Sequence, residues 1–309
     1  MLQYLIILLD DTSASFCHYE NPKTEHRLIP IETLRQGIRF SMMENLMIQF
    51  VYPDYELPAE YNDVVESIDH SKIKPVTEDA DVLVLNELQE VENIDVPIVR
   101  RVSKLEFFDH EEHIVDLLRK TPRLNIVLAD VETFKDEDFD VYKAMLSRLA
   151  EGVKQMYIDG RSPQLNLLTD RMMLNQMNNC GAGETNITLA PNGNFYICPA
   201  FYYEDEADSI GDLEHGLEIK NKQLYKLDHA PICRHCDAWQ CKRCVWLNRK
   251  MTLEVNTPSH EQCVLAHIER NASRELLQDI RKHGTFLPEQ EEIKEIDYLD
   301  PFDKRDEWQ

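Results

Sequence analysis

Four cysteines within one short stretch constrain this chain more than any other feature of its sequence. They follow the pattern C-x2-C-x4-C-x2-C, and they are Cys233, Cys236, Cys241 and Cys244. Two cysteines separated by two residues lie on one turn, so both thiolates can reach a common metal centre. Three further cysteines flank this run, at Cys180, Cys198 and Cys263. Only Cys17 comes earlier in the chain. We therefore expect the second half of the chain to fold around metal.

The N-terminal residues indicate no export signal, so we predict a cytoplasmic location. The apolar run at residues 1–9 is short, lacks a basic flank and leads into Asp10 and Asp11, which is typical of a buried first strand. No other stretch approaches the roughly twenty apolar residues of a transmembrane helix. In the cytosol disulfides are disfavoured, and clustered cysteines usually bind metal. The formal net charge of −24 also argues against nucleic acid or anionic membranes as partners.

The close spacing of the cysteines favours iron–sulfur clusters over structural zinc. Zinc sites with four cysteines usually separate their two pairs by roughly fifteen residues or more, whereas only four residues intervene here. Seven cysteines also exceed the needs of one zinc ion. Cubane clusters accept tight spacing, and one member of a tight run can bind a second cluster. Zinc remains the alternative.

Residues 1–178 alternate short apolar runs with amphipathic segments. This pattern predicts an α/β domain with a mostly parallel sheet, either open or a partial barrel. The predicted strands cover residues 4–9, 46–52, 81–86, 98–102 and 124–129. The predicted helices cover residues 31–44, 110–120 and 141–153.

The sequence beyond residue 178 predicts other elements than the alternating strands and helices of residues 1–178. Two short apolar runs flank Pro191-Asn192-Gly193, which predicts a β-hairpin because Asn-Gly supplies the positive φ angles of a tight turn. Ser259 and Gln262 fit a capping box, which predicts a helix that carries Cys263 and ends near residue 282. Residues 285–309 are strongly acidic, and we expect a solvated tail.

The order of the cysteines resembles the SPASM domain of radical-SAM peptide-modifying enzymes. Cys180-Gly-Ala-Gly183 precedes Gly193-x4-Cys198 and Ile210-Gly-Asp-Leu213, and then come the tight run and a lone Cys263. The run is one residue shorter than that family's usual C-x2-C-x5-C-x3-C in each of its last two gaps. The resemblance implies a SPASM domain with a C-terminal helix over residues 179–284, behind a degenerate radical-SAM-like partial (β/α) barrel.

The resemblance also implies two [4Fe-4S] clusters. Carried over by position, the ligands of the first cluster are Cys180, Cys198 and Cys244. Those of the second cluster are Cys233, Cys236, Cys241 and Cys263. The first set has only three thiolates, so its fourth position is open or is filled by another group. His235 is one candidate for that position.

The barrel lacks the three cysteines, C-x3-C-x2-C, with which radical-SAM enzymes hold their catalytic cluster. If Cys17 takes the middle position, the other two positions fall on Ser13 and Glu20. The second strand leads into Val51-Tyr52-Pro53, whereas the family has a glycine-rich turn there that binds S-adenosylmethionine. The sequence therefore predicts no S-adenosylmethionine cofactor and no cleavage of it by this chain. Catalytic residues cannot be named.

The chain as a whole is similar to the CXXX-repeat peptide maturases of ribosomally synthesised peptide systems. This implies an iron–sulfur component that binds a cysteine-rich precursor peptide beside an active radical-SAM partner. Two alternatives remain open, an electron-transfer or scaffold subunit and a zinc-stabilised binding module. The sequence does not decide whether the chain is an enzyme by itself.

Overall fold

The computed structural model describes residues 1–293, and these residues form two compact units whose segments alternate along the chain. Unit 1 consists of Met1–Leu88, Ile98–Arg101 and Gly181–Ala230. Unit 2 consists of Gln89–Pro97, Val102–Cys180 and the described residues from Pro231 onward. The acidic tail predicted for residues 285–309 lies largely outside the described residues.

The sheet of unit 1 is mostly parallel. Its strands are β1 (Tyr4–Leu8), β2 (Met47–Val51), β3 (His70–Lys74), β4 (Val82–Leu85), β5 (Ile98–Val102), β8 (Asn186–Leu189) and β9 (Phe195–Tyr196). They lie in the order β5-β4-β3-β2-β1-β8-β9. Tyr4 of β1 pairs with Met47 on one side and with Asn186 on the other, both in parallel, and β9 closes the edge as an antiparallel partner of β8. A separate hairpin joins β10 (Gly211–Asp212) to β11 (Gly216–Leu217).

The helices of unit 1 are α1 (Ile31–Glu44), α2 (Ala59–Val65) and α7 (Pro199–Glu204). Helix α1 ends at Asn45, which adopts the left-handed conformation (φ 54°), and the N–H of Leu46 returns to Ser41 O. This left-handed ending satisfies carbonyls that a helix otherwise leaves unpaired. Gly37 lies on the buried face of α1, directly over Leu189 of β8. The missing side chain lets the helix approach the sheet closely.

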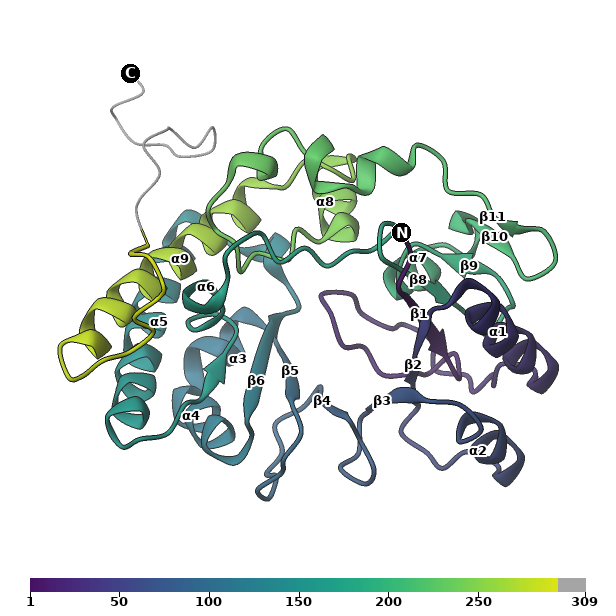
Figure 1. Cartoon of the computed structure of the whole chain (residues 1–309), viewed down its shortest axis with the longest axis horizontal. Helices are drawn as coiled ribbons and strands as arrows, with labels where there is room; N and C mark the ends of the chain where they lie inside the picture. Colours follow the sequence, from purple (N-terminus) through teal and green to yellow (C-terminus); the bar gives the residue numbers. More distant parts are fainter. Residues whose placement is uncertain (294–309) are drawn as a thin grey trace. The chain divides into compact units, whose positions relative to one another are not determined.

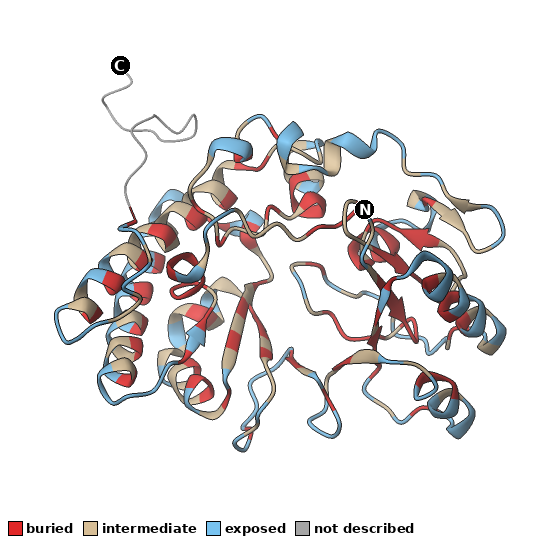
Figure 2. Cartoon of the chain, in the orientation of Figure 1, coloured by how far each residue is buried: buried red, intermediate tan, exposed pale blue. Residues whose placement is uncertain are grey.

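Unit 2 is mainly helical. Its elements are α3 (Lys104–Asp109), α4 (Glu111–Lys120), β6 (Arg123–Leu128), α5 (Asp136–Ile158), β7 (Gln164–Leu165), α6 (Asp170–Met173), α8 (Val245–Thr252) and α9 (His260–Arg281). β6 and β7 pair in parallel. The long helices α5 and α9 lie side by side (Figure 1). Both present a buried stripe and an exposed one (Figure 2), which is the arrangement expected of amphipathic helices.

The predicted α/β class with a mostly parallel sheet is confirmed. Helix 31–44 and strand 98–102 have the predicted bounds, whereas α5 extends the predicted helix 141–153 in both directions to Asp136–Ile158. Helix α9 begins as predicted, because Ser259 Oγ accepts the N–H of Gln262 at 3.2 Å. The predicted hairpin is β8–β9, but its turn differs. Only Gly193 has a positive φ (83°), and its N–H donates to Ala190 O at 2.9 Å. A three-residue loop with one left-handed glycine therefore replaces the expected Asn-Gly turn.

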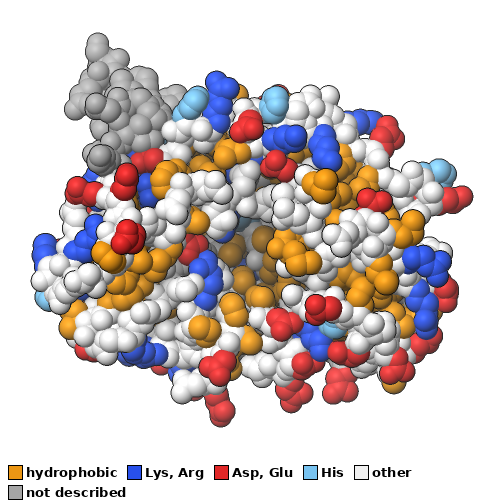
Figure 3. Space-filling model, viewed as in Figure 1, with side chains coloured by type: hydrophobic (Ala, Val, Ile, Leu, Met, Phe, Trp, Pro, Cys, Tyr) orange, Lys and Arg blue, Asp and Glu red, His pale blue; other side chains and the backbone are white. Residues whose placement is uncertain are grey.

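The charges on the surface follow the composition. Acidic side chains are scattered among lysines and arginines on the face seen in Figure 3. None of the helices within the described part of the chain is long and apolar enough to cross a membrane.

Replacing Gly37 by Ala should destabilise unit 1, because the new Cβ would overlap Leu189 Cδ2 in a fully buried position. We expect a loss of about 1–2 kcal/mol in the free energy of unfolding, as is usual for overpacking. Gly152→Ala is the matched control, since its Cβ would meet Val115 only at 3.4 Å. This variant should gain roughly 0.5–1 kcal/mol in the free energy of unfolding from helix propensity. Urea unfolding measures both, and equal stabilisation by the two variants would contradict the close approach of α1 to the sheet.

Candidate metal centre

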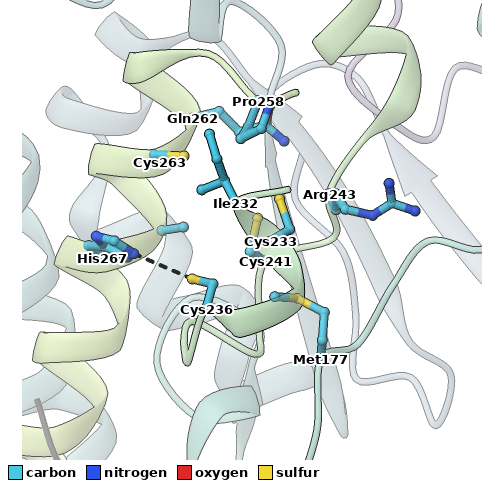
Figure 4. Close-up of a pocket in the computed structure, with 11 residues that line it drawn as sticks. Met177, Ile232, Cys233, Cys236, Cys241, Arg243, Pro258, Gln262, Cys263 and His267 are labelled. Atoms are coloured by element: carbon cyan, nitrogen blue, oxygen red, sulfur yellow. Dashed lines mark hydrogen bonds between the residues drawn. The ribbon is translucent and has the colours of Figure 1, made fainter. Parts of the chain in front are cut away.

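Four cysteines of unit 2 line a single cavity, which we call the cysteine cavity (Figure 4). Cys233, Cys236 and Cys241 come from the loop of residues 231–244, called here the cysteine loop, and Cys263 comes from the first turn of α9. The remaining lining residues are Met177, Ile232, Arg243, Pro258, Gln262, Ala266 and His267. The four cysteines are the set predicted to bind the second cluster, and their assignment as ligands stays a prediction.

Backbone turns direct the thiols of the cysteine loop. The N–H of Cys236 donates to Cys233 O at 3.1 Å, and the N–H of Cys241 donates to Ala238 O at 3.0 Å. Each turn is followed by an amide that donates to a sulfur. Ala238 N–H donates to Cys236 Sγ at 3.4 Å. Arg243, held in the left-handed region (φ 47°), donates its N–H to the Cys241 thiol. Such N–H···S bonds stabilise thiolates, which are the metal-binding form of cysteine.

Burial keeps two of these thiols protonated in the absence of a cation. Desolvation raises the pKa of Cys233 to about 11, although the Arg243 guanidinium acts against this shift. Burial also raises the pKa of Cys241 well above its usual range. A metal centre supplies the positive charge that buried thiols need in order to ionise. Four cysteine thiols, two of them deeply buried, are the kind of donor found both in iron–sulfur clusters and in four-coordinate zinc sites.

Two guanidinium groups lie close to the cysteine cavity in a strongly acidic protein. Arg243 lines the cavity and is only 2% exposed, and its Nε donates to Asn179 Oδ1 at 2.8 Å. Arg171 is near enough to Cys236 for the two to interact electrostatically, and it stacks on the Trp239 ring at 3.9 Å. Burying an anionic centre is costly unless positive groups compensate its charge. These two arginines would compensate the charge of an anionic centre in the cavity.

Polar contacts tie the cysteine loop to α6 and α9. Arg270 donates to Asp237 Oδ1 at 2.6 Å, and Arg171 donates to the Asp237 carbonyl at 2.6 Å. Gln240 donates to Ala266 O at 2.6 Å. The Gln240 side-chain amide also lies 3.3 Å from the Glu269 carboxyl group, which accepts a hydrogen bond from the Tyr142 hydroxyl at 2.7 Å. Desolvation raises the pKa of Glu269 to about 7. The loop is thus held from two helices, and Tyr142 of α5 bonds in turn to Glu269 of α9.

The cysteines predicted for the first cluster are placed as follows. Cys180 belongs to unit 2. Its N–H donates to Lys242 O at 2.9 Å, so the backbone of Cys180 lies beside the cysteine loop, two residues before Cys244. Cys198 belongs to unit 1, where it precedes α7 as the N-cap residue. The first ligand set therefore draws on both units, and it remains a prediction. Among residues 1–293, no group of three or more His, Cys, Asp or Glu side chains is arranged to hold a single metal ion.

The two histidines nearest the cysteines differ in position. His235, the residue considered for the first cluster, is exposed and does not line the cysteine cavity. His267 does line it, and its Nε2 lies 3.4 Å from Cys236 Sγ. Sequence reasoning missed His267. Its position one helical turn after Cys263 was the available signal, because residues four apart share a helix face.

The loop after β1 contains the three positions, Ser13, Cys17 and Glu20, that the sequence comparison aligned with radical-SAM cluster ligands. Ser13 is buried, donates to Val51 O at 2.9 Å and accepts the N–H of Asp10 at 3.1 Å. Cys17 and Glu20 are exposed. At the end of β2, Tyr52 is buried, and desolvation raises its pKa to about 12. The absence of a catalytic cluster and of S-adenosylmethionine stays a prediction.

Arg101 of β5 holds this loop from within unit 1. Its Nε donates to Cys17 O at 2.7 Å, its Nη2 to Tyr19 O at 2.6 Å and its Nη1 to Asn86 Oδ1 at 3.0 Å. Arg101 is 6% exposed. Three well-directed donors in a rigid plane define the path of the loop backbone.

A second polar group fastens the far half of the same loop. Asp11 is 6% exposed and accepts a hydrogen bond from the hydroxyl of Tyr202 on α7. Arg27 reaches both, with Nε 2.8 Å from Asp11 Oδ2 and Nη2 2.8 Å from the Tyr202 oxygen. Lys23 donates to the same tyrosine oxygen at 2.8 Å and pairs with Glu206. These contacts fasten the loop to α7 and to Glu206.

Comparison with known proteins gives matches at the level of structure. No protein-family model matches the sequence, and no curated protein matches it. Histidine-tagged anSMEcpe with bound AdoMet superimposes with a TM-score of 0.65 and 11% identity, covering 91% of this chain and 96% of that chain. The chain has the fold of anSMEcpe. Native anSMEcpe with bound AdoMet and Cp18Cys peptide gives a TM-score of 0.63 and 12% identity, covering 91% of this chain and all (100%) of that one.

A more distant similarity is to SuiB of Streptococcus suis bound to precursor peptide SuiA. Its TM-score is 0.42 at 12% identity, covering 84% of this chain and 75% of that chain. The anSMEcpe match spans both units of this chain, and identities of 11–13% establish a common fold.

Replacing Arg101 by Met should free the loop after β1, because two backbone carbonyls and Asn86 lose a charged donor. We expect the free energy of unfolding to fall by about 2–4 kcal/mol, the usual effect of leaving buried polar groups unpaired. Arg35→Met on the exposed side of α1 is the control and should change stability by at most about 0.5 kcal/mol. Urea unfolding and limited proteolysis across residues 14–25 measure the effect. An intact loop in the Arg101 variant would refute the role given to this arginine.

Proposed function

We propose that this chain is an iron–sulfur component in the maturation of a ribosomally synthesised, cysteine-rich peptide. In this proposal it binds the precursor peptide beside an active radical-SAM partner and does not itself cleave S-adenosylmethionine. The observation that carries the proposal is the gathering of Cys233, Cys236, Cys241 and Cys263 around one cavity, in a chain whose loop after β1 offers no set of cysteines. The anSMEcpe fold supports it, since anSMEcpe has been solved with both AdoMet and a peptide.

The proposal assigns two [4Fe-4S] clusters to a SPASM domain at residues 179–284, behind a degenerate radical-SAM-like barrel at residues 1–178. The second cluster would be held by the four thiolates of the cysteine cavity, with Arg243 and Arg171 compensating its charge. The first would be held by Cys180, Cys198 and Cys244. A cluster with three protein thiolates leaves one iron free, and such an iron binds an incoming thiolate and lowers its pKa.

The chain's own residues would contribute binding and orientation. Arg101 and the Asp11–Tyr202 contact keep the loop after β1 ordered, so unit 1 retains its shape although the loop holds no metal ligands of the family. The net charge of −24 favours a basic peptide, because opposite charges steer association. A cytoplasmic location, where thiols and clusters persist in reduced form, belongs to the same proposal.

Anaerobically purified full-length protein should contain about eight irons and eight acid-labile sulfides per chain, as two cubanes require. Replacing Cys233 and Cys263 together by Ala leaves two thiolates in the cysteine cavity, too few to hold a cubane, and should lower both numbers to about four. Cys17→Ala is the matched control and should keep the full content, because Cys17 is exposed on another loop. Zinc without sulfide in the unmodified protein would contradict the proposal and favour a zinc-stabilised binding module.

A basic peptide with one cysteine should bind more tightly than the same peptide with serine in its place, because only the thiolate can bind iron. We expect at least a roughly tenfold difference in Kd, since a bound thiolate is worth more than one ordinary hydrogen bond. Cys198→Ala should abolish the difference. Equal binding of the two peptides to iron-loaded protein would instead support the electron-transfer or scaffold role.

A further inference from the structure

The wall of the cysteine cavity contains a histidine that no part of the proposed function uses. His267 lies on α9 four residues after Cys263, so one face of the helix presents both side chains to the cavity (Figure 4). Its Nε2 is 3.4 Å from Cys236 Sγ, within hydrogen-bonding distance for sulfur.

The chemistry of the pair decides the direction of this bond. A metal-bound cysteine is a thiolate, and a thiolate can only accept hydrogen bonds. The Nε2 atom of His267 must then carry the proton and donate it toward Cys236 Sγ. This tautomer follows from the acceptor and not from an observed hydrogen.

Cys236 receives more donors from the described residues than a backbone turn alone would give it. Ala238 N–H donates to its sulfur at 3.4 Å, and His267 approaches from the helix. The donor to Cys241 is by contrast a backbone amide, that of Arg243. The bond from His267 is therefore one that a substitution can remove without changing the path of the cysteine loop.

Hydrogen bonds to cluster sulfurs are among the factors that set the reduction potential. Reduction adds one negative charge, part of which resides on the thiolates. An N–H donor stabilises the more negative state more strongly, so it makes the cluster easier to reduce. The same bond orients the Cys236 side chain, as outer-shell partners of metal ligands generally do.

We propose that His267 is a positioning residue of the second cluster, which orients Cys236 and raises the reduction potential by donating a hydrogen bond to its sulfur. This inference rests on the proposed function, because it requires a cluster in the cysteine cavity. It adds a role for His267 that differs from ligation.

The test is an anaerobic redox titration of the full-length protein, followed by electron paramagnetic resonance. His267→Leu removes the donor, His267→Gln keeps an N–H at similar reach, and His283→Leu removes an exposed histidine beyond the end of α9 as the control. The signal that disappears when Cys233 and Cys263 are both replaced by Ala identifies the second cluster. Iron and sulfide are counted for every variant.

We expect His267→Leu to retain its iron and sulfide while the reduced-to-oxidised ratio of the second cluster at a fixed potential falls about tenfold, equivalent to about 59 mV for one electron. His267→Gln should recover part of this ratio, and the first cluster and the His283 variant should be unchanged. An unchanged second cluster in His267→Leu overturns the inference while the proposed function stands. Loss of about four irons in both His267 variants also overturns it, since His267 would then be a ligand. Absence of iron and sulfide from the unmodified protein overturns both proposals.

Discussion

Unit 2 depends on the packing of α9 against α5. The buried stripe of α9 includes Leu265, Leu276 and Ile280, and it meets a stripe of α5 that includes Leu146 and Leu149. Burying such side chains stabilises each by roughly 1.5–3 kcal/mol. The first turns of α9 carry Cys263 and His267, so the apolar contact of the two helices also determines where these two donors lie. The cysteine loop then completes the cavity from a segment without regular strands.

Charge is distributed unevenly between the surface and the interior. The surface is strongly acidic overall, yet the cations nearest the cysteine cavity are the arginines Arg243 and Arg171, each at most 6% exposed. Unit 1 follows the same principle, since Arg101 is buried among backbone carbonyls. A guanidinium has five donors in one plane and stays charged in such surroundings. Arginine therefore has a different task in each of two loops. Beside the cysteine loop it places positive charge near the thiols, and in the loop after β1 it orders the backbone.

The loop after β1 is held by side chains from several parts of unit 1. Arg101 donates to the carbonyl oxygens of Cys17 and Tyr19, and Asp11, Tyr202, Arg27 and Lys23 form a second group of polar contacts. These contacts fix the path of the loop in a chain that has the fold of anSMEcpe.

The local pattern of the chain by itself determined most elements of the sheet and the choice of candidate ligands. Continuous apolar runs such as Tyr4–Leu8 are typical of buried strands in a parallel sheet, and the Ser259 cap with its periodic helix determined α9. Cysteine spacing singled out the tight run of four, and the resemblance to the SPASM domain grouped three of its members with Cys263, the set that lines the cavity. Only the tertiary structure brought His267, Arg243 and Arg171 to those cysteines, and Arg101 to the loop after β1. Hydrogen bonds and charge contacts between residues distant along the chain depend on how helices and loops pack, and the spacing of residues in a sequence does not encode that packing directly.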